Sequence, residues 1–437
     1  MNISVIGAGY VGLVTAAVFA DLGNAVICLD TDEKKVEQLL QGIMPIYEPG
    51  LDEMVKRNME ARRIVFTTEY AATIQQSDIL FIAVGTPPKS DGETDLSQVA
   101  QAARQIGRCM NGYKIVVNKS TVPVGTGDFV QNIIKQENQG AHDFDIVSNP
   151  EFLREGNAIY DTLYPDRIVI GANKNEVAMK LLELYASLEK PMIITDVRSA
   201  EVIKYASNAF LATKISFMNM VADLCEKCGA DINHIKRGMG LDHRIGTQFI
   251  NAGLGYGGSC FPKDTLSLIH TAGKYDVDFG LLKEVVTIND ARSAHFVSLL
   301  QQRFGALAGK RFAVFGLSFK PDTDDMREAK SIEIVRLLHS AKAEVRAYDP
   351  IAMDNARKLM PEVRYCRDPY HTVEDCHAIL LVTEWREFKF LDLRRLKGLM
   401  RSAIIFDGRH LYNKQLKEEF GFEYYALGIP NSFSQQA

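Results

Sequence analysis

Val5-Ile6-Gly7-Ala8-Gly9-Tyr10-Val11-Gly12 decides the fold of the first part of this chain. It follows a short apolar run typical of a buried strand and opens a helical stretch that extends to about Leu22. A second apolar run, residues 25–29, leads to Asp30. Strand, glycine turn, helix and second strand in this order predict a βαβ unit of the dinucleotide-binding type.

Each glycine of the turn has its own physical role. Gly7 permits the tight turn, Gly9 lets the backbone approach a pyrophosphate, and Gly12 lets the helix pack close to the strand. The amino end of the helix offers unpaired N–H groups to phosphates. The Asp30 carboxylate suits a ribose diol and repels a 2′-phosphate, which favours NAD over NADP, although Lys35 weakens that preference. A Rossmann domain without a ligand is the alternative.

Strand-like runs continue through the first half of the chain and alternate with helical segments. They occur at residues 79–84, 115–118, 145–147 and 167–170. This alternation predicts a doubly wound parallel sheet. Residues 199–228 then show helical periodicity without a proline, which is long for a globular helix and predicts a bridge between two domains.

A second α/β pattern begins near Gly309, after mostly helical residues 230–300. It resembles a degenerate copy of the first half, and a nucleotide-like ligand is expected at the carboxyl ends of its strands. The predicted fold class is α/β, with two Rossmann-like doubly wound domains joined by a long central helix and a helical domain. The predicted strands of the second half are residues 311–315, 344–348, 378–382 and 403–406, and the predicted domains are 1–198, 199–300 and 301–437.

Length, charge and cysteine usage bound the class of protein. At 437 residues the chain needs more than one core, and a net charge of −5 provides no polycation for nucleic acid or an anionic membrane. Residues 1–20 lack charged side chains, but the basic region of a signal peptide is missing and glycines break the run. Seven scattered cysteines fit a cytoplasmic protein. Cys225 and Cys228 are predicted to be core residues, and the nine histidines show no metal-binding spacing.

The most informative chemical signal is Gly257-Gly258-Ser259-Cys260-Phe261-Pro262-Lys263-Asp264. A thiolate beside a nicotinamide site can add to an aldehyde and form a thioester that water hydrolyses to an acid. Lys263 supplies local positive charge, and Asp264 can hold or activate water. A buried inert cysteine is the alternative, and it fits poorly in a loop this polar and rich in glycine.

Other polar residues follow predicted strands or share one helix face. Lys204 and Asn208 stand at i and i+4 of the long helix, where they could stabilise an oxyanion; a solvated helix face is the alternative. Thr121, Glu151 and Glu155 follow predicted strands, which is where ligand sites form in such sheets. The alternative for each of them is a structural role as a helix cap or turn residue.

With these residues in view, the chain resembles the UDP-glucose/GDP-mannose dehydrogenase family over nearly its whole length. The resemblance rests on residues 5–12, 84–88 (Val-Gly-Thr-Pro-Pro), 120–126 (Ser-Thr-Val-Pro-Val-Gly-Thr), 149–156 (Asn-Pro-Glu-Phe-Leu-Arg-Glu-Gly), 165–167 (Pro-Asp-Arg), 257–264, 316–320 and 383–385. Such an ordered set of motifs is highly specific.

The resemblance implies an NAD-dependent, two-step, four-electron oxidation of UDP-glucose at C6 to UDP-glucuronate, within nucleotide-sugar metabolism and polysaccharide biosynthesis. Cys260 matches the nucleophile that forms the thiohemiacetal and thioester. Lys204 and Asn208 match the residues that stabilise the oxyanion. Asp264 and Thr121 match the groups around the catalytic water, and Glu151 matches a candidate acid/base; how base work divides among Lys204, Asp264 and Glu151 stays open.

The resemblance also implies ligand contacts and a homodimer, in which Arg244 reaches the sugar bound to the neighbouring subunit. The cofactor positions are Gly7, Gly9, Tyr10, Val11, Gly12, Asp30, Lys35, Thr86, Thr121, Glu155, Lys263 and Arg327. The substrate positions are Glu151, Phe152, Leu153, Arg154, Glu155, Lys204, Asn208, Arg244, Phe249, Ile250, Asn251, Ala252, Gly253, Gly257 and Lys320.

Three other functions remain open at this point. The same chemistry could act on GDP-mannose or a UDP-N-acetyl-hexosamine. A one-step hydroxyacid dehydrogenase shares a Rossmann domain followed by helices but needs no reactive cysteine. A non-catalytic NAD-sensing protein would turn nothing over. The yield of NADH per sugar separates the two-step, one-step and non-catalytic cases.

Overall fold

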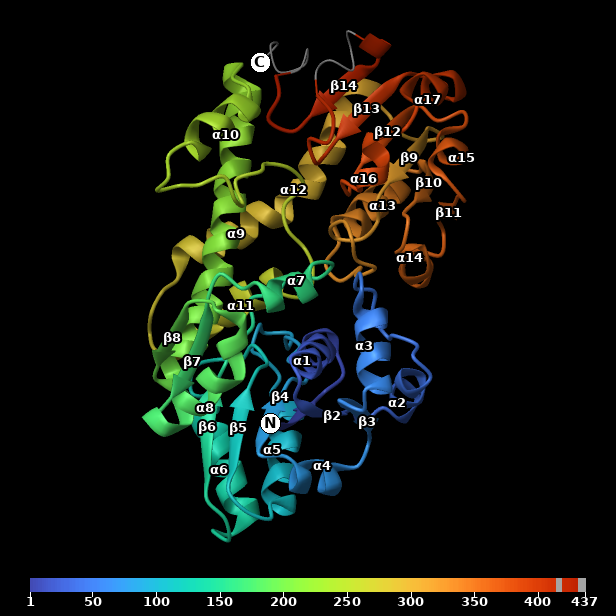
Figure 1. Ribbon diagram of the computed structural model, residues 1–437. Coiled ribbons are helices and arrows are strands. Elements are labelled where there is room, and N and C mark those ends of the chain that lie inside the picture. The colour runs from blue at the N-terminus through green and yellow to red at the C-terminus, as the bar shows by residue number, and fades with distance from the viewer. Residues whose placement is uncertain (414–418, 431–437) are drawn as a thin grey trace. The chain divides into compact units, whose positions relative to one another are not determined.

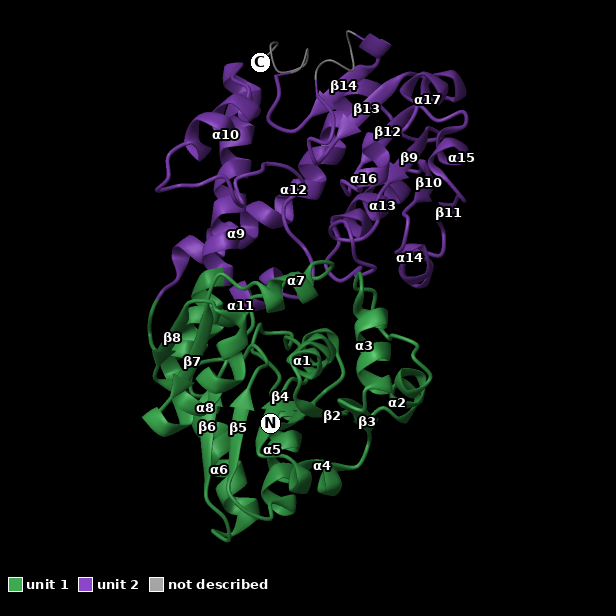
Figure 2. Cartoon of the chain, in the orientation of Figure 1, with its two compact units in different colours: residues 1–207, 266–277 green, residues 208–265, 278–437 purple. Residues whose placement is uncertain are grey.

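The computed structural model describes residues 1–413 and 419–430, which form two compact units (Figure 2). Unit 1 comprises Met1–Ser207 and Leu266–Val277, and unit 2 comprises Asn208–Thr265 and the chain from Asp278 onward. Within the described residues, no helix combines the length and the apolar character needed to span a membrane.

Unit 1 is built on an eight-stranded sheet in the order β3-β2-β1-β4-β5-β6-β7-β8. The doubly wound α/β prediction is confirmed, with one departure, since β7 pairs antiparallel to β6. The connection between these strands holds a short helix in place of a full crossover, and an antiparallel pair needs no crossover. The strands are β1 (Asn2–Ile6), β2 (Ala25–Leu29), β3 (Ile64–Thr67), β4 (Ile79–Ile82), β5 (Lys114–Asn118), β6 (Phe144–Ser148), β7 (Ile168–Ala172) and β8 (Met192–Thr195).

Helices cover both faces of this sheet because successive strand residues point to opposite sides. Val5 belongs to one core and Ile6 to the other. The first core includes residues of α1, α3 and α8, and the second includes residues of α5 and α6. The helices between these strands are α1 (Tyr10–Asp21), α2 (Glu33–Leu40), α3 (Leu51–Glu60), α4 (Tyr70–Gln76), α5 (Ser97–Cys109), α6 (Thr126–Asn138), α7 (Ala158–Leu163) and α8 (Asn175–Tyr185).

The long helix expected at residues 199–228 is α9 (Val197–Cys228), coloured green in Figure 1. The division between the units falls inside it, between Ser207 and Asn208. Near the end of this helix Cys225 is buried as predicted, but Cys228 is exposed, so its prediction as a core residue is wrong. The helical prediction for residues 230–300 is also confirmed by α10 (Ile232–Gly240), α11 (Phe261–Lys274) and α12 (Gly280–Phe304).

Unit 2 contains the second sheet, in the order β11-β10-β9-β12-β13-β14, with every pair parallel. All four predicted strands are present, and β11 and β14 extend the sheet at its two edges. Its strands are β9 (Arg311–Phe315), β10 (Glu344–Tyr348), β11 (Arg364–Tyr365), β12 (Ala378–Leu381), β13 (Ile404–Asp407) and β14 (Glu423–Ala426), and its helices are α13 (Lys330–Ser340), α14 (Met353–Leu359), α15 (Pro369–Val373), α16 (Arg386–Lys389) and α17 (Leu393–Leu399).

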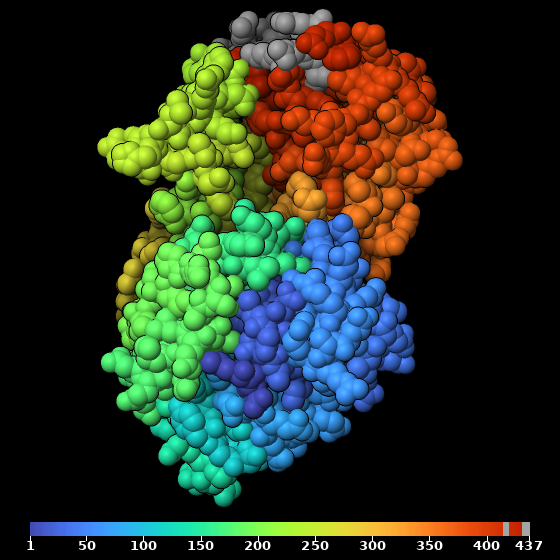
Figure 3. Space-filling view, in the orientation of Figure 1, coloured from blue at the N-terminus to red at the C-terminus, as the bar shows by residue number. Residues whose placement is uncertain are grey.

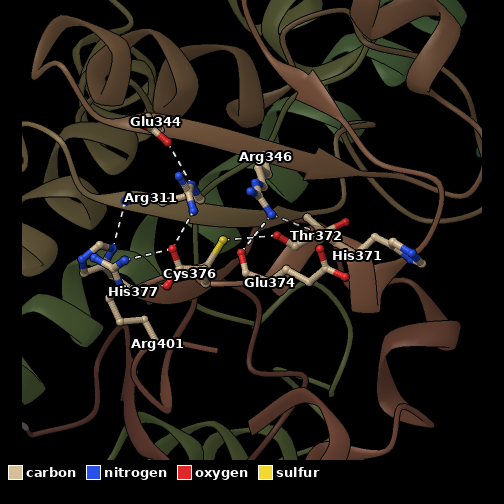
Figure 4. A network of polar contacts seen from close by, with 10 residues as sticks. Arg311, Glu344, Arg346, His371, Thr372, Glu374, Cys376, His377 and Arg401 are labelled. Atoms are coloured by element: carbon tan, nitrogen blue, oxygen red, sulfur yellow. Dashed lines mark hydrogen bonds and ion pairs between the residues drawn. The ribbon is translucent and has the colours of Figure 1, made fainter. Parts of the chain in front are cut away.

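Ion pairs tie the amino ends of the central strands of this second sheet together (Figure 4). Arg311 at the start of β9 binds Glu344 at the start of β10 at 2.8 Å and Asp375 before β12 at 2.9 Å. Arg401 binds the same Asp375 at 2.9 Å. This edge is therefore occupied by structural contacts, and the loops at the opposite, carboxyl ends carry the predicted nucleotide-site residues.

Candidate active site

The glycine turn of unit 1 has the shape that a bound pyrophosphate needs. A Cβ atom added at Gly12 would collide with the carbonyl oxygen of Gly7, so the helix can approach the strand only with glycine here. At Gly9 a Cβ would meet no heavy atom of the described chain within 4 Å, which leaves room in front of the turn. Gly9, the residue before α1, has no side chain and so caps none of the first N–H groups of this helix.

Asp30, at the end of β2, is fixed by three hydrogen bonds. Its Oδ2 accepts from the backbone N–H of Ala8 and from Lys35 Nζ, both at 2.8 Å, and its Oδ1 accepts from Asp32 N–H at 3.0 Å. Burial opposes ionisation, but the hydrogen bonds from Lys35, Asp32 and Ala8 hold the pKa of Asp30 below its usual value. The carboxylate is therefore ionised and held against the glycine turn.

The loops that follow β4 and β5 are joined by side-chain hydrogen bonds. Thr86 Oγ1 donates to the carbonyl oxygen of Thr121 at 3.0 Å, and Ser120 Oγ donates to that of Val84 at 2.8 Å. The structure thus brings two predicted site residues, Thr86 and Thr121, together at the carboxyl edge of the sheet.

Glu151 and Lys204 form a buried ion pair within unit 1. Lys204 Nζ lies 3.0 Å from Glu151 Oε1, and the side chains are 4% and 6% exposed respectively. Glu151 Oε2 accepts from Leu153 N–H at 2.8 Å. The alternative for Lys204, a solvated helix face, is therefore wrong.

A second buried lysine, Lys119, lies near this pair and has no counterpart among the predicted site residues. Lys119 Nζ donates to Asn149 Oδ1 at 3.0 Å, and Asn149 in turn donates to the carbonyl oxygen of Val169 at 2.8 Å. Burial lowers the pKa of Lys119 to about 8, with the charge of Lys204 adding to the effect and that of Glu151 opposing it. The sequence could have indicated Lys119 as a site residue, because it directly precedes the motif that begins with Ser120 and Thr121.

Residues 152–158, which contain four predicted substrate positions, are held by further contacts. The Arg167 guanidinium lies 3.5 Å from the centre of the Phe152 ring, and Arg154 binds Asp161 through Nε at 2.9 Å and Nη2 at 2.7 Å. Glu155 is buried. The Gly156 N–H donates to the Tyr10 hydroxyl at 2.7 Å, so this segment contacts the first turn of α1.

Cys260, in unit 2, stands immediately before α11. Its carbonyl oxygen accepts the first helical hydrogen bond, from Asp264 N–H at 2.8 Å, and its side chain is partly exposed with Sγ 3.6 Å from Ser259 Oγ. The amino end of a helix stabilises negative charge, such as that of a thiolate. This position fits a reactive thiol and does not fit an inert core cysteine.

Asp264 joins two other predicted residues in unit 2. Its Oδ2 accepts from Asn208 Nδ2 at 2.7 Å, and its Oδ1 lies 2.6 Å from Lys263 Nζ. Asp264 is 1% exposed, and Asn208 is buried as well. The i, i+4 spacing of Lys204 and Asn208 thus places two buried polar groups on consecutive turns of α9, each holding a carboxylate.

The glycine-rich loop before Cys260 packs against the first loop of the second Rossmann-like half. Gly258 has φ +80°, and a Cβ there would lie 2.6 Å from the Phe319 ring. Its N–H donates to the carbonyl oxygen of Arg327 at 2.9 Å. Unit 2 therefore brings the predicted positions Gly257, Lys320 and Arg327 into neighbouring loops.

The turn after β9 resembles the glycine turn after β1, but the acidic residue that follows the second strand of this half has different contacts from Asp30. Asp349, at the end of β10, accepts from the backbone N–H of Leu317 at 2.7 Å and from Trp385 Nε1 at 3.0 Å. It is fully buried, and its other oxygen accepts from Ile351 and Ala352 N–H. Protein groups saturate this carboxylate, so it does not correspond to a ribose-binding acid.

Of the remaining predicted substrate residues, Phe249 lies beside the Cys260 loop, whereas Arg244 lies on the surface. Phe249 begins the run 249–253 with φ +61° and packs against Phe261 with ring centres 6.0 Å apart. Arg244 is highly exposed and binds Asp242, with Nη2 2.6 Å from Oδ2. The segment around α10, yellow-green in Figure 3, forms part of the molecular surface.

Two buried carboxylates support the site loops and were missed by sequence reasoning. Glu201 on α9 accepts from the N–H groups of Gly125 and Gly127, both at 2.7 Å, at the start of α6. Glu48 lies in the loop between α2 and α3 and accepts from Gly156 N–H at 2.6 Å. Glu201 gives only a weak sequence signal, as a carboxylate on the same face of α9 as Lys204 and Asn208, whereas nothing local marks Glu48.

The residues of unit 1 therefore fit a dinucleotide. The open space at Gly9, at the start of α1, provides a site for the pyrophosphate. The ionised Asp30 provides a site for the adenosine ribose. These features define a dinucleotide-binding α/β protein.

Comparison with known proteins identifies the family. Three models of the UDP-glucose/GDP-mannose dehydrogenase family match successive parts of the chain, namely the NAD binding domain at residues 1–189, the central domain at 198–291 and the UDP binding domain at 313–414. A UDP-glucose 6-dehydrogenase of Bacillus subtilis is 48% identical to this chain, over 98% of each of the two chains. A UDP-glucose 6-dehydrogenase of Rhizobium meliloti is also 48% identical, over 99% of this chain and 100% of the relative. The chain belongs to this family and is an NAD-dependent oxidoreductase.

Solved structures agree with this assignment. A UDP-glucose dehydrogenase from Pyrobaculum islandicum superposes with a TM-score of 0.92 at 40% identity, over 98% of each chain. A UDP-D-ManNAc dehydrogenase from Pyrococcus horikoshii superposes with a TM-score of 0.87 at 27% identity, over 98% of this chain and 99% of its own.

Proposed function

We propose that this enzyme oxidises UDP-glucose at C6 to UDP-glucuronate, through two successive two-electron steps and a covalent intermediate on Cys260. The observation that carries the proposal is the placement of Cys260 at the amino end of α11, beside the buried pair Asp264–Asn208. A one-step alcohol oxidation needs neither a thiol nor a group to activate water. The UDP-glucose enzymes named above are 40% and 48% identical to this chain, and the ManNAc enzyme is 27% identical, which supports UDP-glucose as the sugar.

The glycine turn would hold NAD, which would supply the two-electron acceptor for each oxidation. Gly9 and the start of α1 would hold its diphosphate, and Asp30 would hold its adenosine ribose. Lys35 orients the Asp30 carboxylate through the 2.8 Å ion pair. The other proposed cofactor contacts are Tyr10, Val11, Thr86, Thr121, Glu155, Lys263 and Arg327.

Cys260 carries the covalent chemistry. Once C6 is an aldehyde, the thiolate adds to it and forms a thiohemiacetal. The thiohemiacetal carbon then loses a hydride, which carries the second electron pair, and its hydroxyl group loses a proton, which gives a thioester. Water then adds to that carbonyl carbon, the C–S bond breaks, the thiolate is restored and the carboxylate leaves with the sugar.

Buried polar groups assist each stage. Lys204 and Asn208 stabilise the negative oxygen on C6 when sulfur or water adds. Asp264 and Thr121 hold the attacking water. Glu151, which is paired with Lys204, exchanges protons with the attacking water, so Glu151 and Lys204 act as one acid/base couple. Asp264 orients the water.

The proposed nucleotide-sugar contacts are residues 151–155, Lys204, Asn208, residues 249–253, Gly257 and Lys320. The positive charge of Lys320 suits the diphosphate of a nucleotide sugar. Residues 1–198, 199–300 and 301–437 then serve as cofactor, central and nucleotide-sugar regions.

We propose further that the enzyme is a homodimer. Phe210, Phe217, Met220 and Leu224 are each more than half exposed and follow helical spacing on α9, so they form one apolar stripe. A second copy of the chain would cover this stripe. Arg244, exposed on the surface, would then reach the sugar of the neighbouring subunit.

Substitution of Phe217 and Leu224 by glutamate tests the dimer, with Leu337→Glu on the exposed face of α13 as control. Light scattering should show a monomer for the double variant and a dimer for the control. Mixed dimers of Arg244→Ala and Cys260→Ser subunits test the shared arginine. If Arg244 acts across the interface, mixing two inactive variants restores about a quarter of the wild-type sites, since half the dimers are hybrid and each has one complete site. No recovery would contradict the shared site.

A comparison of substrates tests the choice of sugar. We expect kcat/KM for UDP-glucose to exceed that for GDP-mannose and the UDP-N-acetyl-hexosamines by about 100-fold or more. A preference for either of these would contradict the proposal for the sugar while preserving the chemistry at Cys260.

A further inference from the structure

Glu48 makes an unusual set of contacts for a loop residue. Its side chain is buried, and both carboxylate oxygens accept hydrogen bonds from donors far along the chain. Oε2 accepts from the Tyr10 hydroxyl and from Gly156 N–H at 2.6 Å, and Oε1 accepts from Ala158 N–H at 2.7 Å. These donors are all uncharged, so the carboxylate is stabilised by hydrogen bonds alone.

The segment that Glu48 holds is the one that contains the proposed substrate positions 152–155. Its first end is fixed by Glu151, which accepts from Leu153 N–H and pairs with Lys204. Glu48 fixes the other end, at Gly156 and Ala158. Two buried carboxylates therefore hold the backbone of a short segment between them.

Tyr10 connects the same carboxylate to the cofactor site. It is the first residue of α1 and follows Gly9, where the pyrophosphate is expected. Its hydroxyl donates to Glu48 and accepts from Gly156 N–H at 2.7 Å. Glu48, Tyr10 and Gly156 thus form a closed set of contacts between the cofactor turn and the substrate segment, in which the one N–H of Gly156 is shared between the Tyr10 hydroxyl and Glu48 Oε2.

We infer that Glu48 is a positioning residue, which couples binding of the cofactor to binding of the nucleotide sugar. The inference rests on the proposed function of residues 152–155. A ligand that orders the first turn of α1 also orders Tyr10 and, through Glu48, the segment 152–158, so the second ligand loses less conformational entropy when it binds. Neither ligand needs to touch Glu48.

The test measures this coupling without turnover. The dissociation constant of UDP-glucose is determined by calorimetry with and without saturating NADH, which cannot oxidise the sugar. For the wild type we expect NADH to tighten UDP-glucose binding by about fivefold or more. In Glu48→Gln the side-chain amide must turn its N–H₂ group toward a backbone N–H group. The factor by which NADH tightens UDP-glucose binding should then fall below about twofold. Tyr10→Phe removes only the hydroxyl group and should also lower the factor by which NADH tightens UDP-glucose binding. This second variant keeps the test decisive if Glu48→Gln fails to fold.

Glu60→Gln, at the exposed end of α3, is the matched control and should keep the wild-type factor. A Glu48→Gln protein with a lower melting temperature but an unchanged factor would show that Glu48 only stabilises the fold, and would overturn the inference. A wild-type factor of one would overturn it as well. A wild-type protein that does not bind UDP-glucose at all would contradict the proposed function and the inference together.

Discussion

Lys204 Nζ lies 3.0 Å from Glu151 Oε1 in a setting where both side chains are almost completely buried. Removing two charges from water is costly, and only a close pair with further hydrogen bonds offsets that cost. Leu153 N–H supplies one such bond to Glu151. A buried pair of this kind is expensive to keep for stability alone, which fits a role in the reaction.

Replacing one member of the pair should therefore destabilise the protein more than replacing both. We expect Lys204→Met to lower the free energy of unfolding by about 3 kcal/mol, because Glu151 loses its partner. The double variant Lys204→Met/Glu151→Gln should lose clearly less than the sum of the two single variants. Denaturant unfolding measures all three, and additive losses would show that the two groups do not interact.

Asp30 should determine which dinucleotide the enzyme accepts. In Asp30→Ala the ribose loses a charged hydrogen-bond acceptor, and Lys35 loses its partner and becomes available to a 2′-phosphate. The ratio of kcat/KM for NAD to that for NADP should fall by about tenfold or more. Steady-state kinetics with both cofactors checks this, with Asp32→Ala as a control at the neighbouring carboxylate. An unchanged ratio would mean that Asp30 does not face the ribose.

Glu201 should make stability depend on pH. Burial raises the pKa of Glu201 to about 7, although the N–H groups of Gly125 and Gly127 oppose the shift. The folded protein then binds more protons than the unfolded chain between about pH 4.5 and 7, so the contribution of Glu201 to stability falls as pH rises through that range.

Glu201→Gln cannot titrate and should not show that fall. The unfolding free energy of the variant minus that of the wild type should increase with pH, by at most about 1.4 kcal/mol per pH unit, and level off above about pH 7. A difference that decreases with pH over this range would show that the two N–H groups keep Glu201 ionised throughout.

Much of the cofactor site could be predicted from the sequence because its determinants are local. Gly7, Gly9 and Gly12 lie in one turn, and Asp30 ends the next strand, so a single βαβ unit brings them together. Cys260 and Asp264 are likewise four residues apart at the start of one helix. The carboxylates that hold the loops could not be found this way, because Glu48 and Gly156 are 108 residues apart and Glu201 and Gly125 are 76 apart.

The direction of β7 shows the same limit. Its apolar run at residues 168–172 predicts a buried strand but carries no information on whether it lies parallel or antiparallel to β6. That choice depends on the path of residues 149–167, which is set by Glu48, Glu151 and Asp161 through long-range or backbone contacts. Sequence pattern gives the elements, and buried polar contacts between distant segments decide how this loop connects them.

The number of NADH molecules released per UDP-glucose consumed should be measured first, for the wild type, Cys260→Ser and the exposed-cysteine control Cys228→Ser. We expect two for the wild type and for Cys228→Ser, with UDP-glucuronate as product. Cys260→Ser should stop turning over before the acid forms. One NADH per sugar from the wild type, or a Cys260→Ser enzyme as active as the wild type, would contradict the thiol mechanism.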